Sequence, residues 1–334
     1  MALCIDPGDM RRIDPYILAI LGTVALASLL PARGLWVPVF GEATTVAIGL
    51  LFFLYGIRLS PQDALAGIRH WRLHGIVFAA TFVLFPLLGL GLRVLVPGVI
   101  SPELYIGLLY VCCLPSTVQS SIAFTSIARG NVSAAICAAS FSNLVGIVLT
   151  PLLVGTLLTT RGGGFSSHAL VDITLQLLLP FVLGQLARRW LVGFVTRHKS
   201  VLGLVDRGSV LLVVYTAFSE GVVAGIWGQL SITSLLALVG VNIALLGVVL
   251  AVTWFGPKLL GFSREDRITI MFAGSKKSLA SGLPMASVLF PAASVGLIVL
   301  PLMLFHQIQL MVCAWLAQRF ARTPAPSPEP ALVA

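Results

Sequence analysis

Apolar stretches of about twenty residues, separated by short polar and basic segments, recur along nearly the whole chain, and such stretches are long enough to span a bilayer as α-helices. We therefore predict ten transmembrane helices whose boundaries lie at prolines, glycines and charged residues. In chain order the predicted helices cover residues 15–31, 41–58, 74–96, 103–128, 131–158, 168–187, 205–227, 233–256, 266–290 and 293–318.

The basic residues test this count, because Lys and Arg concentrate in cytoplasmic loops. With ten helices both termini share one side, and that side holds sixteen of the 21 basic residues: Arg11, Arg12, Arg58, Arg69, Arg72, Arg129, Arg188, Arg189, Arg197, Lys199, Arg207, Lys258, Arg264, Arg267, Arg319 and Arg322. The opposite side holds Arg33, Arg93 and Arg161. We therefore predict that both termini are cytoplasmic, in a bacterial-type inner or plasma membrane.

Composition agrees with a membrane protein and narrows the class of partner. Of the 334 residues 58% are hydrophobic and 10% are charged, whereas soluble domains carry about 25% charged residues. The net charge of +9 follows from the topology and from anionic lipid head groups, so we expect no nucleic-acid partner. The five cysteines lack metal-binding spacing and are interpreted as small hydrophobic residues. The Pro-rich tail at 321–334 is expected to be disordered.

Two predicted helices carry polar clusters beside a helix-breaking residue. In 103–128, Pro115 has no backbone N–H and precedes Ser116, Thr117, Gln119, Ser120 and Ser121. In 266–290, Gly274 precedes Ser275, Lys276, Lys277, Ser278, Ser281, Gly282 and Pro284. Aligning Pro115 with Gly274 superposes the clusters, and five helices in each half would make the second half inverted. Inverted repeats with broken helices in matching positions are typical of secondary transporters. We expect repeats at 1–160 and 161–320, with breaks that meet in the core.

Close helix packing is the alternative for the small residues of these clusters, because serine and glycine often line helix contacts in membranes. Two clusters in equivalent positions, each beside a helix breaker, favour a binding site. In 131–158, Ser140, Ser142 and Asn143 would add oxygens to that site. His306, midway along the last predicted helix, is either a hydrogen-bonded structural residue or a proton-coupling group.

Four segments carry a family resemblance: FFLYGIRLSP at 52–61, LPSTVQSSIAFTSIARGN at 114–131, YTAFSEGV at 215–222 and GSKKSLASGLPM at 274–285. In this order they resemble the bile acid:sodium symporter family, and more closely its SBF-like branch. The resemblance implies an all-α integral membrane fold with ten helices in two inverted five-helix repeats. It also implies a panel of helices 1, 2, 6 and 7 and a core of the other helices, in which helices 4 and 9 cross as broken helices.

The resemblance also implies a sodium site at the crossing. In the symporters, oxygens after the proline of helix 4, from helix 5, and from a glutamate and a glutamine of helix 9 bind sodium. The matching ligands here are Ser120 and Ser121. The chain departs from the pattern on helix 9, where Phe272 and Lys276 fall at the glutamate and glutamine positions. Because an ammonium has no lone pair for a cation, we predict weak sodium dependence.

Lys276, Lys277 and Glu220 are ionisable residues inside predicted helices, where an ionised group costs about 2.5 to 3.5 kcal/mol on insertion scales. Pairing Glu220 with one lysine would leave one positive charge, which suits an anionic substrate or replaces a missing sodium ion. A structural ion pair is the alternative for Lys277, and a protonated acid packed between helices is the alternative for Glu220. We predict that Lys276 supplies a fixed positive charge facing Ser120 and Ser121.

Together these features predict a secondary active transporter that moves a small organic anion by alternating access, with coupling to sodium or to protons. The residues expected to bind substrate or ion are Thr117, Gln119, Ser120, Ser121, Ser140, Asn143, Glu220, Ser275, Lys276, Lys277, Ser278 and His306. A membrane protein that binds or regulates without translocation is the alternative. An intramembrane enzyme is a weaker alternative, because the sequence contains no H-E-x-x-H motif and no phosphate loop. We expect neither catalysis nor a resident cofactor. Substrate identity, transport direction and oligomeric state have no signature in the sequence.

Overall fold

Helices form throughout the computed structural model, which describes residues 15–58, 70–158, 167–225 and 230–322, and these residues contain no β-strand. The elements are α1 (Pro15–Leu29), α2 (Trp36–Arg58), α4 (Trp71–Ala79), the π-helical turn η3 (Ala80–Leu84), α5 (Phe85–Gly91), the 3₁₀ turn η4 (Leu92–Leu95), α6 (Pro102–Cys113), α7 (Gln119–Ile127), α8 (Val132–Leu158), α9 (Ser167–Arg197), α10 (Lys199–Val223), α11 (Ile232–Leu259), α12 (Arg264–Gly274), α13 (Leu279–Leu289) and α14 (Ala292–Arg322). The predictions for Arg11, Arg12, Arg69, Arg161 and the tail at 323–334 lie outside the described residues.

Seven helices of the described residues are long and apolar enough to cross a membrane. They are Trp36–Arg58, Trp71–Leu95, Val132–Leu158, Leu177–Arg197, Lys199–Val223, Ile232–Leu259 and Ala292–Arg322. Leu18–Leu29 and Pro102–Cys113 are shorter apolar helices. The fold is therefore all-α, as predicted, with apolar helices of two lengths.

Two predicted helices are interrupted where the sequence places a proline and a glycine. Residues 114–118 separate α6 from α7, and Leu114 has the extended conformation that a residue before proline favours (φ −76°, ψ 154°). α12 ends at Gly274, and residues 275–278 precede α13, whose first turn is capped by the Ser278 hydroxyl accepting from the Ser281 N–H. These interruptions agree with the breaks predicted at Pro115 and Gly274.

The prediction of a basic loop between 187 and 205 was wrong. α9 continues to Arg197 and α10 begins at Lys199, so His198 alone joins the two helices. Apolar side chains keep the helical pattern through this segment, because Val195 is buried against Leu54 and Ile57 of α2. Packing of this apolar face outweighs the polar composition, and the basic residues project from helices instead of from a loop.

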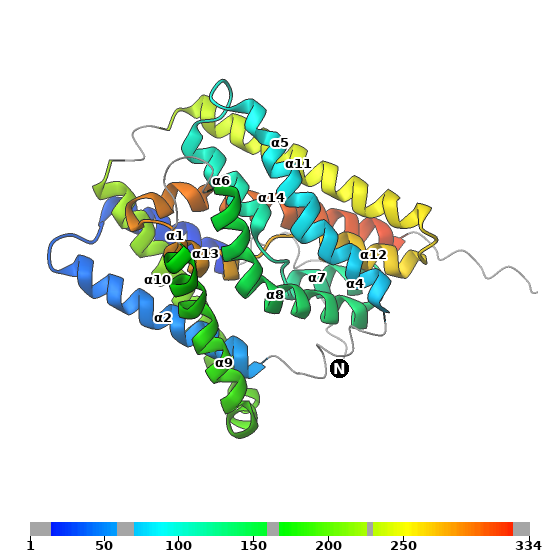
Figure 1. Cartoon of the computed structure of the whole chain (residues 1–334), viewed down its shortest axis with the longest axis horizontal. Helices are drawn as coiled ribbons and strands as arrows, with labels where there is room; N and C mark the ends of the chain where they lie inside the picture. The colour runs from blue at the N-terminus through cyan, green and yellow to red at the C-terminus, as the bar shows by residue number, and fades with distance from the viewer. Residues whose placement is uncertain (1–14, 59–69, 159–166, 226–229, 323–334) are drawn as a thin grey trace, which may run out of the picture.

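Helices α1, α2, α9 and α10 form a four-helix layer along one side of the molecule (Figure 1). Within it α2 packs along α9, and α1 packs along α10. Helix α10 also contacts α13 and α14, and α9 contacts α8, so these pairs join the layer to the remaining helices. The interrupted helices lie in the part of the molecule that faces the layer.

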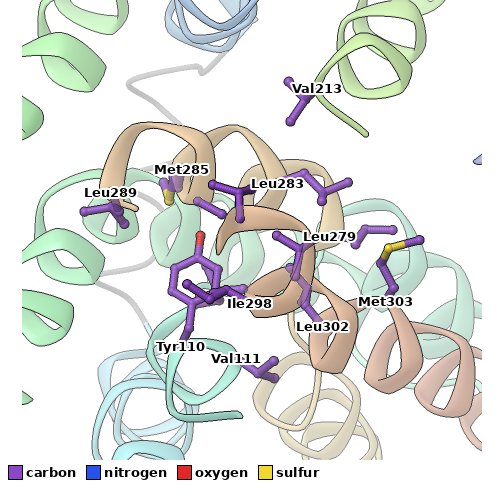
Figure 2. Packing of buried hydrophobic residues seen from close by; sticks show 14 of the residues in the cluster. Tyr110, Val111, Val213, Leu279, Leu283, Met285, Leu289, Ile298, Leu302 and Met303 are labelled. Atoms are coloured by element: carbon purple, nitrogen blue, oxygen red, sulfur yellow. The ribbon is translucent and has the colours of Figure 1, made fainter. Parts of the chain in front are cut away.

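The short helix α13 is held by apolar packing on several sides. Figure 2 shows its side chains, among them Leu283 and Met285, in one cluster with Tyr110 of α6 and Leu302 of α14. The Tyr110 hydroxyl donates a hydrogen bond of 2.6 Å to the carbonyl of Gly282. This packing fixes the helix that follows the second interruption.

Candidate functional site

The two interruptions lie against each other, and we call residues 114–118 together with 275–278 the crossing. The backbone N–H of Ser278 donates to the carbonyl of Pro115 at 2.9 Å. The Ser116 hydroxyl donates to the carbonyl of Ala273 at 2.5 Å. Hydrogen bonds between the two segments thus replace bonds that continuous helices would make internally.

Helix α8 supplies polar side chains to both interrupted helices. The Ser142 hydroxyl accepts from the Ser116 N–H at 3.0 Å, and the Asn143 Nδ2 donates to the Ser116 carbonyl at 2.7 Å. The Asn143 Oδ1 accepts from the Ser281 hydroxyl of α13 at 2.9 Å. Asn143 therefore links the first interruption to the helix that follows the second.

The side chain of Gln309, on α14, binds the backbone of the second interruption. Its Oε1 accepts from the Lys277 N–H at 2.8 Å, and its Nε2 donates to the Lys277 carbonyl at 2.9 Å. The same Nε2 lies 2.8 Å from Nδ1 of His306. Gln309 is buried and was not among the predicted site residues.

Lys277 is fully buried, and its ammonium contacts main-chain oxygens. Its Nζ donates to the carbonyls of Thr81, Cys112 and Leu114 at 2.8, 2.9 and 2.7 Å. The Phe85 ring centroid lies 4.1 Å from the same nitrogen. We call these three oxygens and this ring the carbonyl cage.

Lys276 is equally buried but has different surroundings. Its Nζ lies 4.1 Å from the ring centroid of Phe124 and 5.3 Å from that of Phe272, and it has no hydrogen-bond partner among the described residues. Glu220, half-buried on α10, forms an ion pair with neither lysine within the described residues. Glu220 therefore does not offset the charge of either lysine in this conformation.

The serine pair predicted to bind sodium is engaged within the protein. The Ser120 hydroxyl lies 2.7 Å from the Thr117 hydroxyl, and the Ser121 hydroxyl donates to the Phe272 carbonyl at 3.1 Å. Lys276 forms no hydrogen bond with either serine. Among the described residues no carboxylate is bonded to these hydroxyls, so they lack the acidic neighbour that the resemblance implied for the sodium site.

A cavity of about 870 Å³ lies between the four-helix layer and the crossing. Seven of the predicted site residues line it: Thr117, Gln119, Ser120, Ser140, Asn143, Ser278 and His306. The other five do not: Ser121, Glu220, Ser275, Lys276 and Lys277. The polar cluster after Pro115 thus faces the cavity, whereas neither lysine lines it.

The layer contributes cationic side chains to the cavity that sequence reasoning did not assign to a site. Arg58 at the end of α2, and Lys199 and Arg207 on α10, line it. Asp206 is the single acidic residue among the described lining residues, and it is paired with Arg58. A second cavity of about 440 Å³ shares Arg58, Lys199 and Asp206 with the first. The lining at this end therefore carries an excess of positive charge.

These cations were interpreted from the sequence only as markers of the cytoplasmic side. Their helical spacing contained a further signal, since Lys199, Gly203 and Arg207 are four residues apart and face one side of α10. That signal could not be used while the segment was taken for a loop.

Interrupted helices that meet beside a cavity with polar side chains on its crossing side, inside a bundle of apolar helices, are typical of membrane transporters. The chain belongs to the SBF-like CPA transporter family, which it matches over residues 14–322. With seven long apolar helices among its described residues, it is a multi-pass membrane protein.

Individual relatives cover nearly the same length. The chain is 56% identical over 310 residues to an uncharacterised protein of Pseudomonas aeruginosa, covering 92% of this chain and 93% of that protein. It is 54% identical over 312 residues to the Escherichia coli protein named "Putative symporter YfeH", covering 93% and 94%. It is 30% identical over 308 residues to "Sodium/bile acid cotransporter 7" of Danio rerio, covering 90% and 91%.

Proposed function

We propose that the protein is a secondary active transporter that carries a small organic anion across the membrane by alternating access. The observation that carries this proposal is the cavity between the four-helix layer and the crossing. Polar side chains line its crossing side, and Arg58, Lys199 and Arg207 line its layer side. A site that combines hydrogen-bonding groups with excess positive charge suits a substrate that is polar and anionic.

The proposed architecture has ten transmembrane segments in two inverted repeats, residues 1–160 and 161–320, with both termini cytoplasmic. Support comes from the matching interruptions after α6 and α12, since broken helices in corresponding positions are typical of inverted repeats. The four-helix layer would act as the panel and move relative to the remaining helices. Coupling to protons or to sodium as a co-substrate is part of this proposal.

Uptake into liposomes tests the proposal, with a panel of radiolabelled carboxylates and sulfonates as substrates. We expect saturable uptake of at least one anion. Replacing one cavity cation, in Lys199→Gln or Arg207→Gln, is expected to raise KM about 3- to 10-fold, because a charge contact in a water-filled cavity contributes about 1 kcal/mol.

Lys258→Gln is the matched control, because Lys258 is an exposed lysine on α11 that does not line the cavity. We expect its KM to be unchanged. Equal effects of the three substitutions would contradict an anion site in this cavity. Binding of an anion without uptake would instead favour a protein that binds or regulates without translocation.

A further inference from the structure

The three oxygens of the carbonyl cage come from places where helical hydrogen bonding fails. In a regular α-helix the Thr81 carbonyl would accept from the N–H of Phe85. In the π-helical turn η3 that N–H donates to Ala80 instead. The next residue, Pro86, has no N–H to offer. The Thr81 carbonyl is therefore left without a helical donor and accepts from Lys277.

The other two oxygens are freed by the first interruption. The Cys112 carbonyl would accept from the Ser116 N–H in a continuous helix, but that N–H donates to Ser142. The Leu114 carbonyl lies beyond the last turn of α6, where residues 114–118 are not helical. Both oxygens therefore accept from the Lys277 ammonium, and the negative end of the α6 dipole points the same way.

The cage matches an ammonium in its number of hydrogen bonds. Carbonyl oxygens only accept, and the protonated lysine has three N–H donors, one for each oxygen. The N–O distances of 2.7 to 2.9 Å are those of normal hydrogen bonds. The Phe85 ring adds a face that attracts cations. A neutral amine would turn a lone pair toward one oxygen.

Unwound backbone carbonyls and the C-terminal ends of half-helices are the groups with which secondary transporters coordinate coupling cations. We propose that the carbonyl cage is a monovalent-cation site whose occupant is the Lys277 ammonium, a cation attached to the chain. A free sodium ion has no place there while the ammonium is present. If the proposed transport function holds, the crossing carries its positive charge through every transport step without a free ion at this position.

Removing the tethered cation tests this proposal on purified protein in detergent, without substrate. We expect Lys277→Ala to lower the melting temperature by about 5 °C or more, because three buried carbonyls lose their donor. Ammonium or potassium chloride is expected to restore at least half of this loss. Choline chloride at the same ionic strength, which is bulky and has no N–H donors, is expected to restore none, and it controls for screening by salt.

Lys276→Ala is the matched control, because it removes the neighbouring buried lysine, which contacts rings and no carbonyl. Its melting temperature is expected to be the same in ammonium, potassium and choline chloride. A cation-specific rise in Lys277→Ala alone would support the proposal. The absence of such a rise, or an equal rise in both variants, would overturn it.

The native protein provides a second measurement if Lys277→Ala does not fold. Its melting temperature is expected to be equal in ammonium, potassium and choline chloride, since the cage is already occupied. A rise in the native protein that is specific to ammonium or potassium would overturn the proposal. Neither measurement depends on transport. A failure to find any transported anion would therefore count against the proposed function, whereas the melting temperatures alone test the proposal for the carbonyl cage.

Discussion

Lys276 and Lys277 are adjacent in the sequence and have contrasting surroundings. The Lys277 ammonium donates to three carbonyls, whereas the Lys276 Nζ lies against phenyl rings without a hydrogen-bond partner. A buried charge without hydrogen bonds is costly, and a cation–π contact offsets only about 0.5 to 2 kcal/mol of that cost. The two lysines should therefore respond in opposite ways to the same apolar substitution.

We predict that Lys276→Met leaves the melting temperature unchanged or raises it by a few degrees, because a buried ionisable group without a hydrogen-bond partner is replaced by an apolar side chain of similar length. Lys277→Met is expected to lower it. Thermal unfolding of the two purified variants measures both shifts.

A large fall in stability for Lys276→Met would show that its ammonium has a partner in solution, contrary to this expectation. A more stable variant that no longer transports would instead assign Lys276 a role in transport.

Individual residues differ in how far the sequence predicted their roles. The hydroxyl and amide cluster after Pro115 was predictable, because polar side chains stand out in the sequence of an otherwise apolar helix. Thr117, Gln119 and Ser120 do line the cavity. The carbonyl cage was not predictable, because every residue has a carbonyl and only the fold brings those of Thr81 and Leu114 together.

At the level of elements, α2 and α9 approach closely because each has a glycine at the contact. A Cβ on Gly56 would meet the Phe181 carbonyl, and a Cβ on Gly184 would meet the Phe53 carbonyl. Small residues of this kind let helix backbones come together within a membrane. The two glycines therefore set the spacing inside the four-helix layer.

We predict that Gly184→Ala destabilises the protein by about 1 to 3 kcal/mol, because the added methyl group overlaps a backbone atom that cannot move without separating the helices. Gly193→Ala, on the same helix with nothing within 4 Å of the added Cβ, is the control. We expect it to be neutral or stabilising, since alanine favours helices over glycine. Thermal or denaturant unfolding of both variants gives the comparison, and equal stabilities would show that α2 and α9 are not closely packed.

The sequence predicted the interruptions well and the ends of α9 and α10 poorly. Pro115 and Gly274 change the backbone itself, so their effect does not depend on tertiary contacts. The continuation of α9 to Arg197 depends on the burial of Val195 against α2, which a count of charged residues does not reveal.

On the scale of the whole molecule, the cavity lies where the four-helix layer meets the remaining helices, and its cationic end coincides with the end of α2 and the start of α10. The proposed topology puts this end on the cytoplasmic side. Under that topology we expect the cavity to be reached from the cytoplasm in this conformation.

We predict that a cysteine at position 204 reacts with a charged maleimide in inside-out vesicles and is protected in right-side-out vesicles. Leu204 lines the cavity near its cationic end. A cysteine at position 35 is the control and is expected to react from the opposite side. Leu35 is exposed just before α2, and the 23 residues of that helix separate it from Arg58 by about 34 Å.

The native protein, carried through both preparations, gives the background labelling. Cys112, Cys113 and Cys313 are buried, Cys137 is half-buried, and Cys4 lies outside the described residues. Labelling of both positions from the same side would contradict the proposed topology.

The hydrogen bonds of Asn143 set a direction for any molecule in the cavity. Its Nδ2 already donates to the carbonyls of Ser116 and Ala139, so both of its N–H groups are in use. Its Oδ1 accepts from Ser281 and retains a second lone pair. Toward the cavity the carboxamide can therefore accept a hydrogen bond but cannot donate one. A hydroxyl group of a ligand can donate a hydrogen bond there, whereas an anionic oxygen cannot. A solute with an acid group at one end and a neutral polar group at the other would therefore bind in one orientation, with the acid group toward Arg207 and the neutral group toward the crossing.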